Sequence, residues 1–373
     1  MRTLGDQPLP SVRLTWARRL IKPTARRPAE AYGLTAAAEE DLIKALVQDS
    51  YVSAKGVVHV EDVEMPLVGD AEVLVRVRAA SAKMYGWDLP AIVQSVGRMI
   101  ARFRKPKVRV PGLDFAGDVE AVGNDVIRFR PGAAVFGLSK GALAEYVSVT
   151  EDALAVKPTI VSFAEAATIA VAGPTALHAL RKGQVESGHH VLVVGASGGV
   201  GTFAVQLAKA FGADVTGVCS TKNLELVLSL GADHAIDYTR EDFTRGGPRY
   251  DVILDMAGSH SLSDLRRALR PDGTLVMVGQ SGIPTSDQTW FKSLSRWLRA
   301  AVWSRFIGQR LVALIQPKAE GALDTLKDFI EAGQLTPIVT ATHPLSEAPE
   351  AIKRFEQGHG QGRMVIEFLP SDT

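Results

Sequence analysis

The sequence predicts an α/β protein in which a doubly wound parallel sheet follows a β-rich unit. From Ser162 onward, short apolar runs alternate with segments at helical spacing, which is typical of a parallel sheet with right-handed crossovers. Between residues 42 and 160, short runs rich in β-branched residues alternate with turn residues, which indicates antiparallel strands. A strand, a glycine-rich turn and a helix over residues 190–212 form the centre of the parallel unit.

Length and composition limit the class of protein. The 373 residues are enough for two domains, and a hydrophobic fraction of 46% is sufficient for full-sized cores. The 42 Lys and Arg residues against 41 Asp and Glu residues give a net charge of +1, which argues against a nucleic acid or an acidic lipid as partner. The single cysteine, Cys219, excludes an internal disulfide and a cysteine-rich zinc site, and we expect it to be a small hydrophobe in a strand.

Residues 1–41 do not have the pattern of a core segment. Basic residues outnumber acidic ones there, and prolines interrupt the segment, so we expect a flexible or loosely docked arm. Trp16, Leu20 and Ile21 lie beside arginines, and the alternative is therefore a targeting or membrane-surface segment. No stretch has the length of a membrane span or the apolar centre of a secretory signal, so we expect a cytoplasmic protein with no stable membrane insertion.

The β-rich unit is expected to hold short strands and one helix. The helix is predicted over Ile92–Arg104, and the basic residues around it are either a solvated face or a contact for an anionic ligand. The strands are predicted at Ile43–Val47, Val57–Val60, Val73–Val77, Val108–Val110, Phe115–Val122 and Ala134–Phe136.

The second half contains the alternating elements. Ser162 and Glu165 have capping-box spacing ahead of an Ala-rich helix. An apolar stripe with arginines over residues 285–312 indicates a core-packed helix or dimer face, with a flap over an apolar substrate or a membrane-surface contact as alternatives. The other predicted elements are strands at Val215–Cys219, His234–Asp237, Val252–Leu254, Thr274–Val278 and Met364–Phe368, and helices at Leu224–Leu230, Leu262–Leu269, Leu323–Ile330 and Ala351–Phe355.

The glycine-rich turn is a candidate phosphate site. His190–Val194 is predicted as a buried strand, and the helix after the turn ends at Gly212. Backbone N–H groups at a helix start, together with the helix dipole, favour a pyrophosphate that a Cβ would keep away. The dinucleotide fingerprint G-x-G-x-x-G is met except at its first glycine. The candidate cofactor contacts in the turn are Ala196, Ser197, Gly198, Gly199, Val200 and Gly201.

The end of the next strand indicates which cofactor binds. NAD sites place an Asp or Glu about 20 residues past the glycines, where it accepts the ribose hydroxyls. Here Val215–Cys219 is followed by Ser220-Thr221-Lys222-Asn223, which offers hydroxyls and an ammonium group and no carboxylate. Ser220 and Lys222 therefore predict NADPH as the cofactor, with an exposed helix-start lysine as the alternative interpretation of Lys222. Tyr238, just past the following strand, is a further candidate contact.

These motifs together resemble the medium-chain dehydrogenase/reductase superfamily, in its zinc-free quinone oxidoreductase-like branch. The match rests on Glu72–Ser81, on Gly112–Gly117 with Val119–Gly123, on Gly173–Leu177, on the glycine turn and on Leu230–Tyr238. The resemblance implies a GroES-like catalytic domain with a Rossmann-type domain inserted into it. Members of the family are usually dimeric or tetrameric, and a homodimer is expected here. The expected division is an arm at 1–41, the first part of the catalytic domain at 42–160, the NADPH domain at 161–316 and a return to the catalytic domain at 317–373.

The resemblance also bears on zinc. Zinc-dependent relatives hold the metal with a histidine in a Gly-His-Glu motif, and that position is Leu113 here. Catalytic zinc needs three protein ligands, and the remaining histidines have no ligand spacing, so no metal is expected. His189 and His190 abut a buried strand and are expected to be structural rather than ligands. Without a Lewis acid, quinones and the β-carbons of enals or enones are favoured hydride acceptors.

One loop departs from the family pattern. Relatives commonly have Asn-Pro-x-Asp-Trp after the first-domain strand, whereas this chain has Lys83-Met84-Tyr85-Gly86-Trp87. That loop borders the nicotinamide in the family, so Lys83 or Tyr85 is a hypothetical donor to a developing oxyanion. Thr175 matches a family position near the nicotinamide, where its hydroxyl is expected to contact the carboxamide.

The sequence therefore predicts an NADPH-dependent oxidoreductase that acts on a small apolar carbonyl or quinone substrate. The enzyme alternative is an NADP-dependent alcohol or aldehyde dehydrogenase. An alternative of another class is an NADPH-binding scaffold protein with little turnover, because the loop at Lys83–Trp87 is altered.

Overall fold

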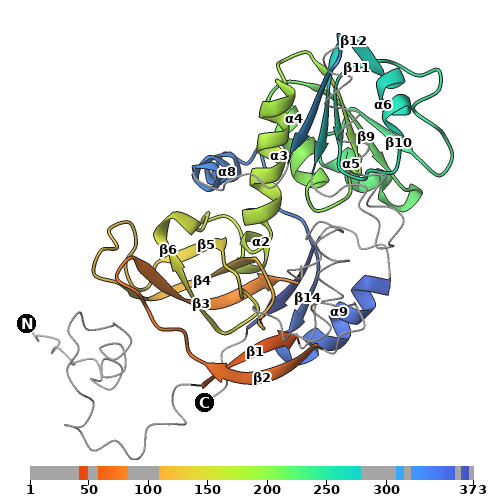
Figure 1. Cartoon of the computed structure of the whole chain (residues 1–373). Coiled ribbons are helices and arrows are strands. Elements are labelled where there is room, and N and C mark those ends of the chain that lie inside the picture. Colours follow the sequence, from red (N-terminus) through yellow and green to blue (C-terminus); the bar gives the residue numbers. More distant parts are fainter. Residues whose placement is uncertain are drawn as a thin grey trace, which may run out of the picture.

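The structure, a computed structural model, describes residues 42–48, 58–82, 109–278, 308–314, 321–357 and 363–368. Its elements form two lobes, one around a mixed sheet and one around a parallel sheet (Figure 1). We call them the first and the second lobe. Helix α3 (Ile169–Gly183) lies at their junction and packs against strands of both. The predicted arm at 1–41, the predicted helix at 92–104 and most of the 285–312 stripe lie outside the described residues.

The first lobe contains a seven-stranded sheet in the order β14-β15-β3-β4-β5-β7, with β6 paired to β3, and a separate antiparallel ribbon β1-β2. Its core forms where alternate apolar residues of these strands, such as Val75 and Phe115, are fully buried. The strands are β1 (Leu42–Gln48), β2 (Val58–Glu64), β3 (Glu72–Ser81), β4 (Asp114–Val122), β5 (Ala134–Leu138), β6 (Tyr146–Thr150), β7 (Leu154–Val156), β14 (Val339–Pro344) and β15 (Arg363–Glu367).

One predicted strand is wrong. Arg109 and Val110, the described part of the expected 108–110 strand, lie outside any strand. Pro111 follows them and has no backbone N–H for a ladder, although the Arg109 carbonyl still accepts a bond from the Gln48 N–H at 2.9 Å.

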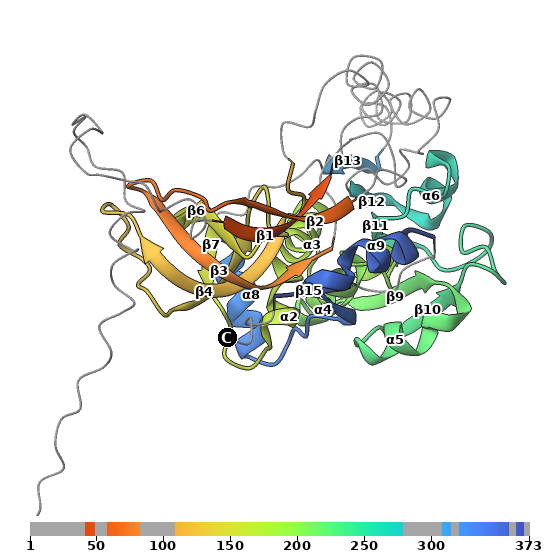
Figure 2. The same ribbon diagram turned by 90° about the horizontal axis from the view of Figure 1, so that it is seen from below.

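The last strand returns to the first lobe, as the family resemblance implies. β15 pairs antiparallel with β3, placing Val365 opposite Ser81 and Ile366 opposite Ala80 (Figure 2). The parallel-sheet lobe is therefore inserted between two parts of the chain that build one sheet.

The second lobe is the predicted doubly wound parallel sheet, in the order β10-β9-β8-β11-β12-β13. In β8 (His190–Val194), Val191 and Val193 pack into the cluster that contains α3 and α4 (Gly201–Ala210). Leu192 and Val194 pack into the cluster that contains α6 (Leu262–Ala268). Both faces are thus covered, which explains the continuous apolar runs. The strands are β8 (His190–Val194), β9 (Asp214–Cys219), β10 (His234–Asp237), β11 (Tyr250–Asp255), β12 (Leu269–Val278) and β13 (Arg310–Leu314).

The helices begin and end largely where local signals place them. Ser162 and Glu165 form the predicted capping box at α2, and Gly212 and Gly231 adopt positive φ just after α4 and α5. The remaining helices are α2 (Phe163–Ala166), α4 (Gly201–Ala210), α5 (Leu224–Ser229), α6 (Leu262–Ala268), α8 (Ala322–Glu331) and α9 (Ala348–Gln357), with short 3₁₀ turns η3 (Glu151–Ala153), η4 (Thr221–Asn223) and η5 (Leu345–Glu347).

Candidate functional site

The glycine turn lies at the carboxyl end of β8, next to the point where the strand order reverses between β8 and β11. Gly195 has a φ of +88°, and its N–H donates to the Val218 carbonyl at 3.1 Å. A Cβ at Gly201 would lie 2.1 Å from the Gly195 carbonyl oxygen, so only glycine lets helix α4 start this close to the strand. The turn therefore has the tight strand-to-helix geometry of a dinucleotide site.

The departure from the fingerprint at Ala196 is compensated by the neighbouring strand. Ala196 is fully buried, and its N–H donates to the Val218 carbonyl at 3.0 Å. Opposite it, β9 carries Gly217, where a Cβ would lie 3.0 Å from the Ala196 methyl carbon and 2.4 Å from Cγ1 of Val227. The methyl group at 196 is accommodated because β9 has no side chain there.

The rest of the turn is accessible to a ligand. Ser197, Gly198, Gly199 and Val200 are partly exposed, and α4 begins at Gly201. N–H groups in the first turn of a helix lack carbonyl partners within that helix, and the helix dipole adds partial positive charge there. This end of α4 can bind an anion.

A buried arginine from the last strand also contacts this turn, and the sequence analysis did not find it. A Cβ at Gly199 would lie 2.8 Å from Nε of Arg363, so the guanidinium lies directly against the glycine backbone. Nη1 of Arg363 donates to Oγ of Ser81 at 3.2 Å and to Oδ2 of Asp114 at 2.5 Å.

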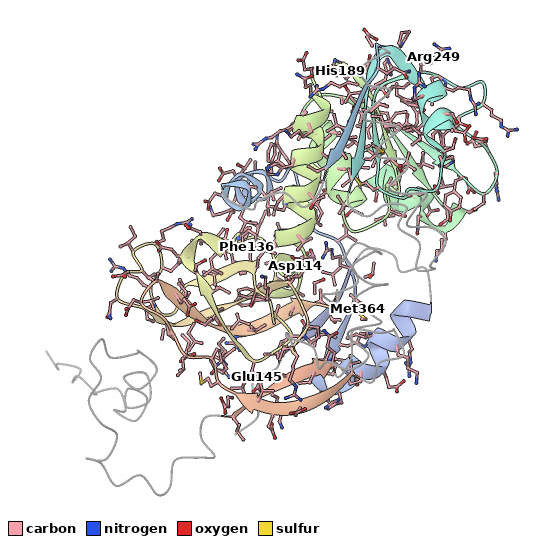
Figure 3. All side chains as sticks on the ribbon, viewed as in Figure 1. Asp114, Phe136, Glu145, His189, Arg249 and Met364 are labelled. Carbon is pink, nitrogen blue, oxygen red and sulfur yellow. The ribbon has the colours of Figure 1, made fainter. Side chains whose placement is uncertain are left out.

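This ion pair is nearly excluded from solvent. The side chains of Arg363 and Asp114 are 8% and 1% exposed. Figure 3 shows Asp114 and Met364, the neighbour of Arg363, in the part of the first lobe nearest the second lobe. The available sequence signal was a charged residue directly before the apolar residues Met364–Ile366 that begin the predicted strand Met364–Phe368.

The structure brings the glycine turn and the end of β9 together. Nδ2 of Asn223 donates to Oγ of Ser197 at 2.8 Å and to Oγ of Ser220 at 3.3 Å. Because each hydroxyl oxygen accepts from Asn223, each hydroxyl hydrogen can be donated elsewhere. Asn223 is 6% exposed and thus forms a buried bridge between two predicted contact residues.

Lys222 and Tyr238 follow the carboxyl ends of the neighbouring strands β9 and β10. Lys222 is exposed in turn η4, and Tyr238 is 54% exposed just after β10, with its N–H donating to the Cys219 carbonyl at 3.1 Å. The expectation that this edge carries no carboxylate is incomplete, because Asp237 of the neighbouring strand reaches the Thr221 hydroxyl at 2.5 Å. This carboxylate was not predicted, because the acidic residue was expected only directly after the strand that precedes Ser220, whereas Asp237 comes from the neighbouring strand β10.

Thr175 lies apart from these residues, within α3. Its hydroxyl donates to the Val171 carbonyl at 2.6 Å, one helical turn earlier, and the residue is partly buried. Its oxygen keeps lone pairs that can accept a hydrogen bond. Lys83 and Tyr85 lie outside the described residues, and their roles stay predictions.

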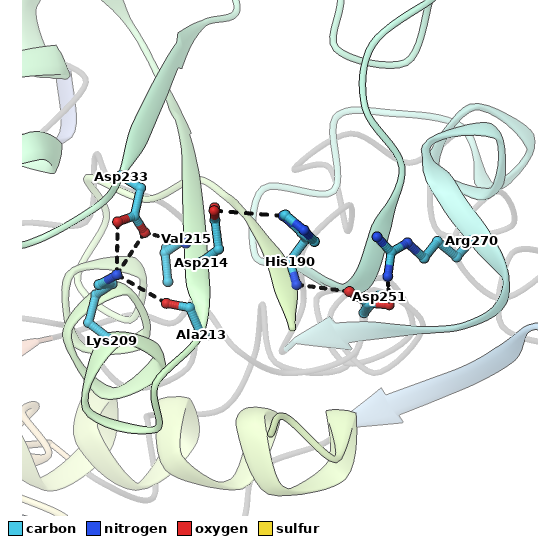
Figure 4. Close-up of polar contacts among 8 residues, drawn as sticks. All are labelled: His190, Lys209, Ala213, Asp214, Val215, Asp233, Asp251 and Arg270. Carbon is cyan, nitrogen blue, oxygen red and sulfur yellow. Dashed lines mark hydrogen bonds and ion pairs between the residues drawn. The ribbon is translucent and has the colours of Figure 1, made fainter. Parts of the chain in front are cut away.

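One position of the zinc-dependent pattern has no donor atom in this chain. Leu113 is 6% exposed and has no atom that can bind a metal. The structure's described residues contain no cluster of three His, Cys, Asp or Glu side chains placed to hold a metal ion. Nδ1 of His190 lies 3.8 Å from Oδ2 of Asp214, and the backbone N–H of His190 donates to Oδ2 of Asp251 at 2.8 Å (Figure 4). Cys219 is buried at the end of β9, as expected of a small hydrophobe in a strand. This burial raises the pKa of its thiol to about 11.

Two family models match the chain. Residues 69–159 match the alcohol dehydrogenase GroES-like domain, and residues 230–366 match the zinc-binding dehydrogenase model. The chain is 32% identical over 343 residues to the chloroplastic quinone-oxidoreductase QR1 of Triphysaria versicolor, covering 87% of this chain and 98% of that protein. The chain belongs to the medium-chain dehydrogenase/reductase superfamily, in its quinone oxidoreductase-like branch.

Other relatives of this dehydrogenase/reductase agree on the fold and on the broad chemistry. It is 34% identical over 234 residues to the 2-methylene-furan-3-one reductase of Solanum lycopersicum, covering 62% of this chain and about half, 53%, of that protein. The quinone oxidoreductase structure from Coxiella burnetii superposes with a TM-score of 0.72 at 27% identity, covering 88% of this chain and 100% of that one. The matches include NAD(P)H oxidoreductases, so the cofactor class is a nicotinamide dinucleotide.

The described helices and the relatives bear on the predicted cytoplasmic location of the protein. Among the described residues, none of the helices is long and apolar enough to cross a membrane. Since relatives include chloroplastic forms, a cytoplasmic location stays a prediction.

Proposed function

We propose that this dehydrogenase/reductase uses NADPH to transfer hydride to quinones or to the activated C=C bond of enals and enones. The observation that carries the proposal is a pair of cationic, hydroxyl-bearing features at the carboxyl ends of β8 and β9. One is the glycine turn with Arg363 against Gly199, and the other is the turn with Ser220 and Lys222. Asn223 bridges Ser197 of the first feature to Ser220 of the second, so the two features lie side by side and suit a ligand with a pyrophosphate and a further phosphate.

Each part of the cofactor has residues of matching chemistry. The N–H groups at the start of α4 and the Arg363 guanidinium would hold the pyrophosphate. Ser220 and Lys222 would hold the 2′-phosphate, beside Tyr238. The Thr175 oxygen would accept from the carboxamide, because its own proton is donated to Val171. The bound cofactor supplies the hydride, while these residues fix its position relative to the substrate.

The substrate class follows from the donor set and from the relatives. Since Leu113 occupies the position of the ligand histidine, substrates that accept hydride without a strong Lewis acid are favoured. A quinone oxidoreductase and a furanone reductase are among the similar proteins. In enal and enone reduction, charge develops on the carbonyl oxygen, and hydrogen-bond donors stabilise it. Lys83 and Tyr85 are the proposed donors, and the idea fails when Lys83→Ala and Tyr85→Phe both leave kcat unchanged.

The test is oxidation of NADPH, followed by absorbance, against a panel of quinones, enals, enones and aldehydes. We expect turnover with quinones or enones, unaffected by EDTA, and a kcat/KM at least about tenfold higher with NADPH than with NADH. The control is Lys222→Ala, which should raise KM for NADPH and leave the NADH reaction nearly unchanged. EDTA-insensitive alcohol oxidation with NADP⁺ would instead favour an alcohol dehydrogenase, and tight NADPH binding without turnover would favour a scaffold protein.

A further inference from the structure

Strand β10 ends in a buried carboxylate beside the turn that would hold the 2′-phosphate. Asp237 is 5% exposed and lies opposite Cys219 of β9 in the parallel ladder. At first sight, a carboxylate at this edge argues for NAD, because an acidic group there usually accepts the ribose hydroxyls and repels a phosphate. The contacts of Asp237 lead to a different conclusion.

Both oxygens of Asp237 already accept hydrogen bonds from the protein. Oδ2 accepts from the Thr221 hydroxyl at 2.5 Å and lies 3.5 Å from Nε of Arg240. Oδ1 accepts from the N–H of Thr239 at 3.0 Å and from its hydroxyl at 2.7 Å. These bonds, that from Thr221 foremost, lower the pKa of Asp237, so the carboxylate is ionised at neutral pH.

A ribose diol would therefore have to displace Thr221 or Thr239 to reach this carboxylate. The Arg240 guanidinium, whose Nε lies 3.5 Å from Oδ2, offsets part of the negative charge. Thr221 is the first residue of turn η4, which continues through Lys222 to Asn223. Asp237 thus holds one end of this turn, and the Asn223 bridge to Ser197 and Ser220 holds the other.

We propose that Asp237 is a positioning residue that selects NADPH indirectly. Through the Thr221 hydroxyl it fixes turn η4, so that Ser220 and Lys222 are preorganised for a 2′-phosphate. A ribose diol would have to compete with the protein groups that already donate to the Asp237 oxygens. This inference rests on the proposed use of NADPH and adds a specificity-determining residue that does not touch the cofactor.

The test compares the dissociation constants of NADPH and NADH, measured by titration calorimetry on the full chain, in Asp237→Asn, Thr221→Val and Thr221→Ser. A hydrogen bond to a charged group is strong enough that its loss should weaken NADPH binding about tenfold in the first two variants. NADH lacks the phosphate, so its dissociation constant should change by no more than about twofold. Thr221→Ser keeps the hydroxyl and should restore NADPH affinity, which a purely steric role would not predict.

Asp233→Asn is the matched control at the opposite end of the same strand pair. Asp233 accepts from Nζ of Lys209 at 2.8 Å and from the Val215 N–H at 2.7 Å (Figure 4). It anchors the start of β9 rather than its end, so this variant should lower the melting temperature without changing the ratio of the two dissociation constants.

The wild-type measurement separates the two proposals. A wild-type chain that prefers NADH overturns the proposed function. The positioning role alone is overturned when the wild-type chain prefers NADPH but Asp237→Asn and Thr221→Val weaken the binding of NADPH and NADH equally. The positioning role is supported when both variants lose affinity for NADPH but not for NADH, and Thr221→Ser keeps the affinity for NADPH.

Discussion

Arg363 and Asp114 form an ion pair in a place that solvent barely reaches. Removing one member of such a pair leaves the other charge buried and uncompensated, which is far more destabilising than losing an exposed pair. The pair also has a functional position, because Arg363 lies against Gly199 of the glycine turn. Asp114 therefore orients a cation that the cofactor would contact.

We expect Asp114→Ala to lower the free energy of unfolding by about 3–5 kcal/mol, because it strands the Arg363 guanidinium. Urea denaturation followed by circular dichroism measures this change. The matched control is Asp118→Ala on the same strand, whose partner Arg78 lies at 2.8 Å with both side chains about 30% exposed. Loss of that pair should cost about 1 kcal/mol or less. Equal losses of unfolding free energy in the two variants would contradict the larger cost assigned to breaking the buried pair.

At the scale of single elements, the turn between β8 and α4 is fixed by backbone packing. Gly201 and Gly198 both lie in this turn, yet only one of them lacks room for a side chain. A Cβ at Gly201 would overlap the Gly195 carbonyl oxygen at 2.1 Å, whereas a Cβ at Gly198 would lie 3.2 Å from the same atom.

Gly201→Ala should therefore shift the start of α4, lower the free energy of unfolding by about 3 kcal/mol and weaken binding of both nicotinamide cofactors. Gly198→Ala should have a clearly smaller effect on stability, since a shift of a few tenths of an ångström relieves the contact. Thermal unfolding and calorimetric titration of the two variants provide the comparison. A Gly201→Ala protein of wild-type stability would show that the turn is looser than described.

Elements with local signals and the family's chain path were predicted from the sequence, whereas side-chain contacts between distant elements were not. The capping box at Ser162, the glycine turn and the return of β15 all follow from residue spacing or from the family resemblance. The tolerance of Ala196 depends on Gly217 in another strand, and Arg363 reaches Gly199 only after the chain has passed through the whole second lobe. Asp237 was missed for the same reason, because strand order rather than sequence brings it to Thr221.

At the scale of the whole molecule, several ionised carboxylates stabilise the fold, either at the start of one helix or between strands. A hydrogen bond from the Ser261 hydroxyl, with Arg267 nearby, lowers the pKa of Asp264. Burial raises the pKa of Asp233, but the bonds from Lys209 and from the Val215 N–H outweigh it, so that pKa is also lowered. In Figure 4, Asp251 similarly joins β11 to the His190 N–H and to Arg270.

Lowered folded-state pKa values determine the sign of the pH dependence. Their stabilisation is present above the unfolded carboxyl pKa of about 4 and is lost as the pH falls through the folded values. The urea midpoint should therefore fall steadily below about pH 4 and stay nearly constant between pH 5 and 7. Asp233→Asn should flatten part of that decline. A midpoint that rises on acidification would contradict this account.

The late position of β15 in the chain has a consequence for biosynthesis. The glycine turn is synthesised well before Arg363, so the nucleotide-binding lobe can form while its last cationic group is still missing. When β15 joins β3, one event completes the first sheet and delivers that guanidinium to the turn. A nascent protein would therefore gain full cofactor affinity only after β15 has docked, and ligand binding would then favour molecules in which β15 is in place.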